Sequence, residues 1–231
     1  MSKPFKLCIL RLSAIGDVCH AVAMVSAIQR HKPDVQITWV IGKIEHQLVG
    51  HLPNIRFVVY DKSKGKQAKL KVQQSLQDTV FDSLFVMQVA LRANLLSRVI
   101  KAKQRVGFDY KRSKEGHSLF INKRIAPRTH AHVLDGFMGF AETLGVPVLE
   151  KPRWHLKPLA KDEQWVTQKF THKFAVISPA ASKAERNWLP ERYAEIANYL
   201  TQQGLEVVLC GGPGQLDKDT AMAILSHTNI T

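Results

Sequence analysis

The chain has 231 residues, of which 45% are hydrophobic and 23% are charged, and its formal net charge is +14 at pH 7. This composition is that of an ordinary globular protein with a sizeable core, and the sequence has no apolar run of about 18 residues that could span a membrane. The strong positive charge predicts an acidic partner, such as nucleic acid, an anionic membrane surface or a phosphorylated substrate.

The first 150 residues alternate between apolar runs and helical patterns. Alternation of this kind predicts βαβ units and a mostly parallel, doubly wound α/β sheet. We expect residues 1–150 to form one Rossmann-like domain. The predicted strands are residues 5–12, 36–42, 55–61, 81–88 and 104–109, and the predicted helices are residues 17–30, 92–102 and 132–144.

A second α/β pattern follows a segment with many prolines and charges. Residues 151–173 are predicted to be a linker, and residues 174–231 to be a second Rossmann-like domain. This domain shows only two strand–helix units, and the sequence ends where a further strand is expected. We therefore expect a partial second domain.

The cysteines and the N-terminal residues indicate the cellular compartment of the protein. Cys8, Cys19 and Cys210 are odd in number and widely spaced, and Cys8 and Cys210 lie in or at the end of apolar strand patterns. This predicts buried free thiols in a reducing compartment. The N-terminal stretch lacks a small-residue cleavage site, which argues against a signal peptide. We expect a cytoplasmic protein, and docking on a membrane face stays open.

The stretch RLSAIGDVCHAV, residues 11–22, places Gly16 and Asp17 between the first strand and the first helix. It contains neither G-x-G-x-x-G nor a Walker A sequence. Asp17 lies where ligands bind in open α/β sheets, and two roles are open. It could cap the helix and complement its dipole. Alternatively, because a carboxylate would repel a diphosphate, Asp17 would face a neutral hydroxyl as a general base.

The stretch SPAASKAERNWLPERYAEI, residues 178–196, is a candidate anion site. Small residues allow close backbone approach, while Ser182, Lys183 and Arg186 supply donors ahead of a helix N-terminus. This pattern predicts a diphosphate site, and the alternative is a surface loop whose cations face water. The glycines around Gly212 either admit a ligand or only turn the chain.

Basic residues are dense in residues 62–71 and 98–128. They form either a solvated surface or a binding surface for an anion. No aromatic residues interleave the lysines of residues 62–71, and no helix-turn-helix or zinc-finger spacing is present, so we expect no nucleic-acid partner.

We also expect no metal. His130 and His132 lack ligating companions at suitable spacing, and His20 is expected to be a packed or capping residue. Asp217 and Asp219 would diverge on a helix.

Several of these stretches together resemble glycosyltransferase family 9, the ADP-heptose:lipopolysaccharide heptosyltransferases. The matching stretches, in the family's order, are ILRLSAIGDVCHAVAMVSAI, FDSLFVMQVALRANLLSRVIKAKQRVGFD, HAHVLDGFMGFAETLGV, SPAASKAERNWLPERYAEIANYL and EVVLCGGPG. The middle match is looser, because the family often has Gln-Gly where this chain has Gln88 and Val89. The family's remaining nucleotide-gripping element, Asp-Ser/Thr-Gly followed by His, has no counterpart in this sequence.

The resemblance implies a GT-B architecture of two Rossmann-like domains and an inverting, metal-independent transfer of heptose from ADP-heptose. Asp17 matches the family's general base, and the acceptor implied is the anionic lipid A–Kdo core at the inner membrane. The resemblance implies a donor set of Ser182, Lys183, Arg186 and Gly212. It implies an acceptor set of Ser13, Gly16, Lys62, Lys64, Arg105, Lys111 and Arg112.

Two alternatives to this implied function stay open. The enzyme could use another nucleotide sugar, because the sequence does not define the sugar pocket. The chain could also be a truncated, non-catalytic module that binds an anionic ligand. The basic residues are compatible with peripheral contact with an anionic membrane.

Overall fold

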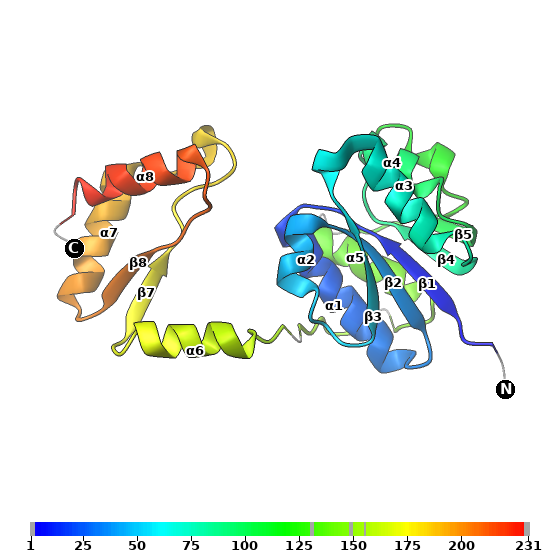
Figure 1. Cartoon of the computed structure of the whole chain (residues 1–231), viewed down its shortest axis with the longest axis horizontal. Helices are drawn as coiled ribbons and strands as arrows, with labels where there is room; N and C mark the ends of the chain where they lie inside the picture. The colour runs from blue at the N-terminus through cyan, green and yellow to red at the C-terminus, as the bar shows by residue number, and fades with distance from the viewer. Residues whose placement is uncertain (1–2, 130–131, 148–149, 155, 229–231) are drawn as a thin grey trace. The chain divides into compact units, whose positions relative to one another are not determined.

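The computed structural model describes residues 3–129, 132–147, 150–154 and 156–228. The chain divides into two compact units, Met1–Leu156 and Lys157–Thr231, each an α/β unit with its own parallel sheet (Figure 1). The division falls within residues 151–173, where the sequence predicts a linker. None of the helices in the described parts of the chain is long and apolar enough to cross a bilayer.

The first unit is built on a six-stranded sheet of order β3-β2-β1-β4-β5-β6, in which every pair is parallel. Because the chain moves from β1 outward to β3 and then returns to the other side of β1, the strand order reverses between β1 and β4. The crevice at such a switch point, at the carboxyl ends of the strands, is where ligands bind in open α/β sheets. The strands are β1 (Lys6–Leu10), β2 (Gln36–Gly42), β3 (Ile55–Tyr60), β4 (Phe81–Val86), β5 (Ala102–Gly107) and β6 (Lys123–Arg124).

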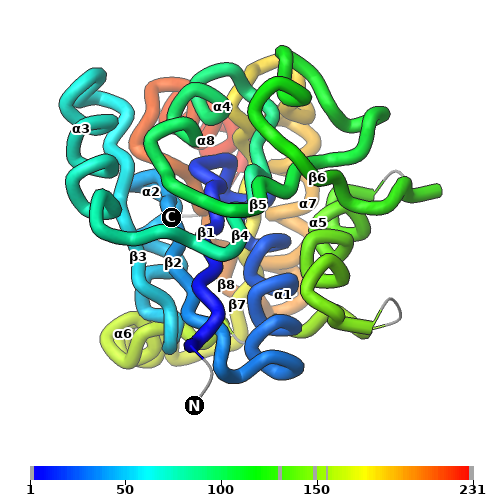
Figure 2. The backbone as a smooth tube through the Cα atoms, turned by 90° about the vertical axis from the view of Figure 1, so that its right-hand side faces the viewer, coloured from blue at the N-terminus to red at the C-terminus, as the bar shows by residue number. Residues whose placement is uncertain are grey.

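Helices cover both faces of this sheet because its strands are apolar on both sides. Leu7 and Ile9 of β1 pack in one cluster with α1 (Ile15–His31) and α5 (Val133–Glu142). These two helices lie side by side (Figure 2). The alternate residues Cys8 and Leu10 pack in a second cluster on the opposite face. The helices of that second cluster are α3 (Gly65–Leu76) and α4 (Leu91–Ser97).

Three helices fall where the sequence predicts none. In α3, only Ala68, Val72 and Leu76 are buried. Most of the residues between them are lysines and glutamines, so their four-residue spacing gives a weak helical signal. In α6 (Ala160–Lys169), no residue is buried, so there is no apolar periodicity to detect, and the predicted linker contains this helix. The third is the short α2 (Lys43–Val49). The helix predicted over residues 92–102 is shorter, because α4 ends at Ser97 in a turn that leads to β5.

The second unit pairs β7 (Phe174–Ile177) with β8 (Glu206–Leu209) in parallel. The crossover helix between these strands is α7 (Pro190–Gln202), which starts with proline at its first turn, and α8 (Gln215–Leu225) packs against α7. Helix α7 buries Ala194 and Ala197, and α8 buries Thr220 and Ile224. The side chains of Phe174 and Val176 on β7 stay exposed. Cys210, which follows β8, is also exposed, so its predicted burial is wrong. The α/β pattern predicted for this part of the sequence is thus present as a two-stranded unit.

Candidate active site

Asp17 lies in the first turn of α1, the helix that follows the carboxyl end of β1. The helix N-cap is Ala14, and Asp17 is the third helical residue. Its Oδ2 accepts a hydrogen bond of 3.3 Å from the backbone N–H of Ala14, so the side chain satisfies one free donor of the helix end. Asp17 is therefore not the N-cap that the capping alternative requires, although it does close the first turn. Its side chain is still 31% exposed.

Arg11 is the direct partner of this carboxylate. Its guanidinium forms an ion pair with Oδ2 of Asp17, and Nη1 donates to the backbone carbonyl of Met87 at 2.5 Å. The guanidinium carbon lies 5.3 Å from the ring centroid of Phe137 on α5. Burial lowers the pKa of Arg11, and the charge of Asp17 opposes part of that shift. The ion pair connects β1, the end of β4, α1 and α5 at the switch point.

Asp17 opens on a cavity of about 240 Å³. Arg112, predicted as an acceptor-binding residue, lines the same cavity, and its Nη1 donates to Asp109 Oδ2 at 2.6 Å. The wall thus combines one carboxylate with two guanidinium groups and an apolar lining. The complete lining is Arg11, Asp17, Val89, Phe108, Arg112, Val133 and Phe137.

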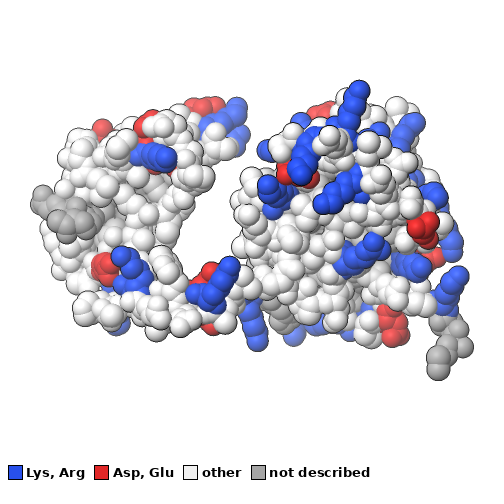
Figure 3. All heavy atoms as spheres, viewed as in Figure 1, with Lys and Arg blue, Asp and Glu red and all other residues white. Residues whose placement is uncertain are grey.

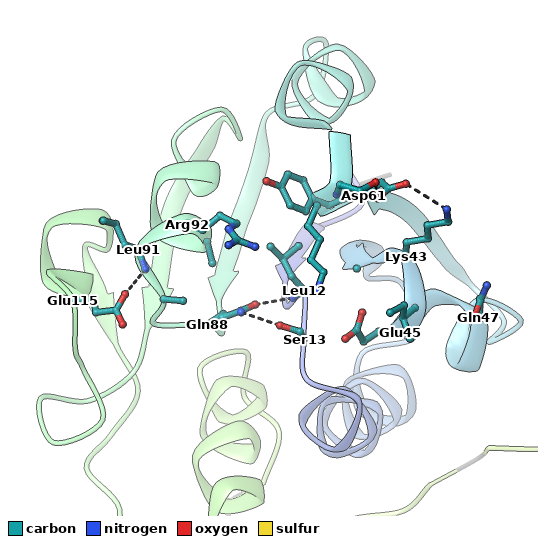
Figure 4. Close-up of a pocket in the computed structure, with 17 residues that line it drawn as sticks. Leu12, Ser13, Lys43, Glu45, Gln47, Asp61, Gln88, Leu91, Arg92 and Glu115 are labelled. Carbon is teal, nitrogen blue, oxygen red and sulfur yellow. Dashed lines mark hydrogen bonds and ion pairs between the residues drawn. The ribbon is translucent and has the colours of Figure 1, made fainter. Parts of the chain in front are cut away.

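A larger cavity of about 660 Å³ adjoins residues 12–13 and includes the predicted acceptor residues Ser13 and Lys62 (Figure 4). Gln88, directly after β4, organises its floor. The Oε1 of Gln88 accepts from the backbone N–H of Leu12 at 2.9 Å, and its Nε2 donates to Oγ of Ser13 at 3.2 Å. Ser13 therefore lies on a segment that Gln88 holds in place. Lys62 lies on the short helix η1 (Lys62–Lys64).

Charged side chains that the sequence analysis did not select also line the larger cavity. Arg92 extends from α4 toward Leu12, and Glu45 extends from α2 toward Ser13 (Figure 4). Lys43 Nζ lies 3.4 Å from Asp61 Oδ2, so that cation is already balanced. Gln88 could have been predicted from the sequence as a site residue. It lies in the loop after β4, just as Ser13 lies in the loop after β1, and the carboxyl ends of adjacent parallel strands lie at the same edge of a sheet. Arg92 and Glu45 carry no comparable sequence signal.

None of the remaining predicted acceptor residues lines either of these two cavities. Lys64 and Lys111 are exposed, and neither lines a cavity described above. Arg105 departs from the expectation of an acceptor contact, because its guanidinium donates to the carbonyls of Phe120, Ile100 and Ser97 at 2.7–3.0 Å. Gly16 faces open space, since a Cβ added there would meet no atom within 4 Å.

In the second unit, Ser182, Lys183 and Arg186 lie on one exposed loop between β7 and α7. Lys183 Nζ is 3.5 Å from Glu185 Oε1. Within the described residues, the side chains of Ser182 and Arg186 have no hydrogen-bond or ion-pair partner. The loop is fixed by Asn187, whose Oδ1 accepts from the backbone N–H of Ala181 at 2.7 Å.

Gly212 and the nearby aspartates form a local network. The N–H of Gly212 donates to Oδ1 of Asp217 at 2.7 Å, so this predicted donor-binding amide already has a protein partner. Asp219 instead accepts from Gln215 Nε2 at 2.7 Å. The two aspartates thus serve different partners.

The histidines near α1 have structural contacts. His132 accepts from the backbone N–H of Leu134 at 3.1 Å, at the start of α5. The rings of His20 and His132 meet edge to face, 5.4 Å apart. His130 lies outside the described residues. Among the residues that the structure covers, no group of three histidine, cysteine or acidic side chains is arranged to hold a metal ion.

Comparison with known proteins relates this geometry to a family of transferases. Residues 69–231 match glycosyltransferase family 9 (heptosyltransferase). The lipopolysaccharide core heptosyltransferase OpsX of Haemophilus influenzae is 46% identical over 234 residues, which cover 98% of this chain and 67% of that protein. Lipopolysaccharide heptosyltransferase 1 of Escherichia coli K12 is 20% identical, over 94% of this chain and 72% of that protein.

Solved structures share the fold at lower identity. E. coli heptosyltransferase WaaC with ADP matches with a TM-score of 0.79 and 18% identity, over 97% of this chain and 73% of that one. A family 9 glycosyltransferase from Veillonella parvula matches with a TM-score of 0.81 and 21% identity, over 98% of this chain and 67% of that one. The predicted GT-B-like α/β fold, with a partial second domain, is confirmed. This chain spans about two thirds of the length of the Haemophilus protein.

Proposed function

Because the chain belongs to glycosyltransferase family 9, we propose that it transfers a heptose from ADP-heptose to the lipid A–Kdo inner core of lipopolysaccharide, with Asp17 as general base. The observation that carries the proposal is the place of Asp17. Its carboxylate stands at the carboxyl end of β1, at the switch point of the sheet, and opens on a cavity. The 46% identity to a lipopolysaccharide core heptosyltransferase supports the substrate class.

The proposed reaction is an inverting displacement at the anomeric carbon of the heptose. The acceptor hydroxyl oxygen forms the new bond, its proton passes to Asp17, and the bond from the anomeric carbon to the diphosphate oxygen breaks. ADP leaves with the electron pair of that bond. Asp17 suits the base role because its carboxyl group is partly exposed and is held by Arg11.

The developing charge on the leaving diphosphate needs cationic donors. Lys183 and Arg186 carry such charge on an exposed loop, and the hydroxyl of Ser182 lies beside them. Cations that meet the leaving group can stabilise it without a metal ion, so we expect the reaction to be metal-independent. Gly212 would have to exchange its hydrogen bond with Asp217 to contribute its amide.

The acceptor carries phosphate and carboxylate groups, and the first unit offers cations around both cavities. Lys62 and Arg92 line the larger cavity, and Arg112 lines the smaller one. Lys and Arg side chains also gather over the part of the first unit that holds α3 and α4 (Figure 3). We expect the enzyme to meet its lipid acceptor at the cytoplasmic face of the inner membrane, through peripheral electrostatic contact.

The test is transfer by the protein expressed from its complete reading frame. The reaction contains ADP-heptose and a heptose-free lipid A–Kdo acceptor, and parallel reactions contain UDP-glucose or GDP-mannose. We expect ADP release together with an acceptor mass increased by one heptose, both with and without EDTA. Transfer only from another nucleotide sugar would replace the proposed donor. Binding of anionic ligands without transfer would identify a non-catalytic module.

A further inference from the structure

We propose that Arg11 is the positioning residue of Asp17, holding one carboxylate oxygen so that the other faces the acceptor hydroxyl. This inference rests on the proposed function, since it assigns a partner to the proposed base. It adds a residue outside the catalytic and binding sets that the sequence predicts.

Arg11 is fixed by contacts from several elements. Its Nη1 donates to the carbonyl of Met87, just past β4, and its guanidinium lies against the ring of Phe137 on α5. Its own backbone follows the last residue of β1. A guanidinium held from three sides presents Nη2 in one direction, and that nitrogen contacts Asp17. The geometry of the ion pair is therefore set by the sheet and α5 rather than by Asp17 alone.

The contacts of Asp17 are asymmetric between its two oxygens. Oδ2 receives both the Arg11 guanidinium and the backbone N–H of Ala14. Within the described residues, Oδ1 has no hydrogen-bond partner. Two donors on one oxygen resist rotation of the carboxylate, because rotation would break both contacts. Oδ1 is thus the oxygen available to a hydroxyl in the adjoining cavity.

Burial is also asymmetric across this ion pair. The side chain of Arg11 is 11% exposed, whereas that of Asp17 is 31% exposed. Both side chains line the cavity, and the carboxylate is the more exposed of the two. A second buried pair in the same unit, Arg128 with Glu142, differs in this respect, because its side chains are 16% and 14% exposed. Both arginines have a buried Nε without a partner among the described residues, so Arg128 is a closely matched structural control.

Charged and titratable side chains near Asp17 lie in three places. Arg11 follows β1, Arg112 lies in the turn after β5 and lines the same cavity, and His20 lies one turn further along α1. Glu45 acts on Arg11 at longer range. Because Arg112 is engaged by Asp109, Arg11 is the cation that contacts the Asp17 carboxylate directly.

The experiment is a double-mutant cycle with the Arg11→Met, Asp17→Asn and combined variants, in the protein expressed from its complete reading frame. We expect Arg11→Met to lower kcat by on the order of 10²-fold through misplacement of the base, with little change in the KM for ADP-heptose. Arg11→Lys, which keeps the charge, should recover part of the loss. The combined variant should be no slower than Asp17→Asn alone, because Arg11 acts through Asp17.

The controls separate this inference from the proposed function. Arg128→Met should lower the melting temperature as Arg11→Met does, while its kcat stays near the unmodified value. Full activity of Arg11→Met, or additive losses in the combined variant, would overturn the positioning role and leave the base assignment intact. Full activity of Asp17→Asn would instead overturn the proposed function. If Arg11→Met does not fold, Arg11→Lys with unchanged kcat would overturn the inference.

Discussion

The guanidinium of Arg11 pairs with the carboxylate of Asp17 at the carboxyl end of β1, and the cation is the more buried partner. A pair that served only to stabilise the fold could be buried equally on both sides. Here the carboxylate faces a cavity at the strand-order switch point. A negative charge can occupy this helix N-terminus, where an anion would otherwise bind, because the diphosphate is proposed to bind to the second unit.

Gly16 lends itself to a substitution that separates stability from activity. A Cβ at Gly16 would meet no protein atom, and the residue lies in the first turn of α1. We expect Gly16→Ala to stabilise the fold by about 0.5–1 kcal/mol, since alanine loses less backbone entropy in a helix, and to lower kcat/KM by intruding on substrate space. Urea unfolding and transfer rates measure the two effects.

The matched control for Gly16 is Gly204, which also faces open space but has a φ of +79°. Gly204→Ala should destabilise the protein through backbone strain and leave kcat/KM unchanged. Equal activity of Gly16→Ala and unmodified protein would show that the space beside Gly16 is not used by a substrate.

Gln88 is predicted to control the order of the segment that carries Ser13. Gln88→Leu removes both hydrogen bonds and leaves the N–H of the buried Leu12 without that acceptor. We expect a loss of about 1–3 kcal/mol in the free energy of unfolding, with a raised KM for the acceptor. Gln88→Glu keeps an acceptor for Leu12 but no donor for Ser13, so its loss of stability should be smaller. Equal losses in both variants would contradict this division of roles.

The order of strands and helices along the chain was largely open to prediction. The strand predicted at residues 36–42 coincides with β2, and those near residues 55–61 and 81–88 overlap β3 and β4, because buried parallel strands are apolar throughout. Helices α3 and α6 were missed for a common reason. Their polar and charged residues outnumber the buried ones, so hydrophobic periodicity gives little signal.

The site was predictable where a side chain lies in the loop or first helical turn after a strand. Asp17, Ser13 and Gln88 all lie at the carboxyl ends of β1 and β4, and general rules for α/β sheets point there. The direction of the Arg105 side chain was not predictable. Its hydrogen bonds go to the carbonyls of Phe120 and Ile100, and their positions depend on the tertiary fold. The partners of Arg11 likewise come from β4 and α5, far away in sequence.

His117 should make the stability of the first unit depend on pH. It is buried, and its Nε2 accepts from the backbone N–H of Phe108 at 3.3 Å. Burial lowers the pKa of His117 from 6.5 to about 4, and Arg124 adds to the shift. Between these values the unfolded chain binds a proton that the folded chain does not. The free energy of unfolding should therefore fall by about 3 kcal/mol from pH 7 to pH 4 through this residue.

Urea unfolding at several pH values tests the His117 prediction. His117→Gln should remove this component of the pH dependence, whereas His51→Gln, at an exposed histidine, should leave it in place. An unchanged slope in His117→Gln would contradict the assignment.

Arg186 is predicted to bind the donor diphosphate. Arg186→Met should raise the KM for ADP-heptose roughly tenfold or more, because a hydrogen bond to a charged group is lost, with a smaller effect on acceptor KM. Arg192 provides the control, since it pairs with Glu195 at 2.9 Å on the exposed surface of α7. If Arg186→Met and Arg192→Met show the same donor KM, the loop does not bind the diphosphate.

In the proposed reaction, Asp17 accepts the proton of the acceptor hydroxyl. Asp17→Asn keeps the shape of the side chain and an oxygen for Arg11 and Ala14, but removes the base. The direct measurement is the single-turnover rate of heptose transfer at saturating ADP-heptose and acceptor. We predict a fall of roughly 10²–10⁴-fold with ADP-heptose binding retained. A fall of only about twofold, far smaller than the loss of a general base produces, would contradict the assignment of Asp17 as the base.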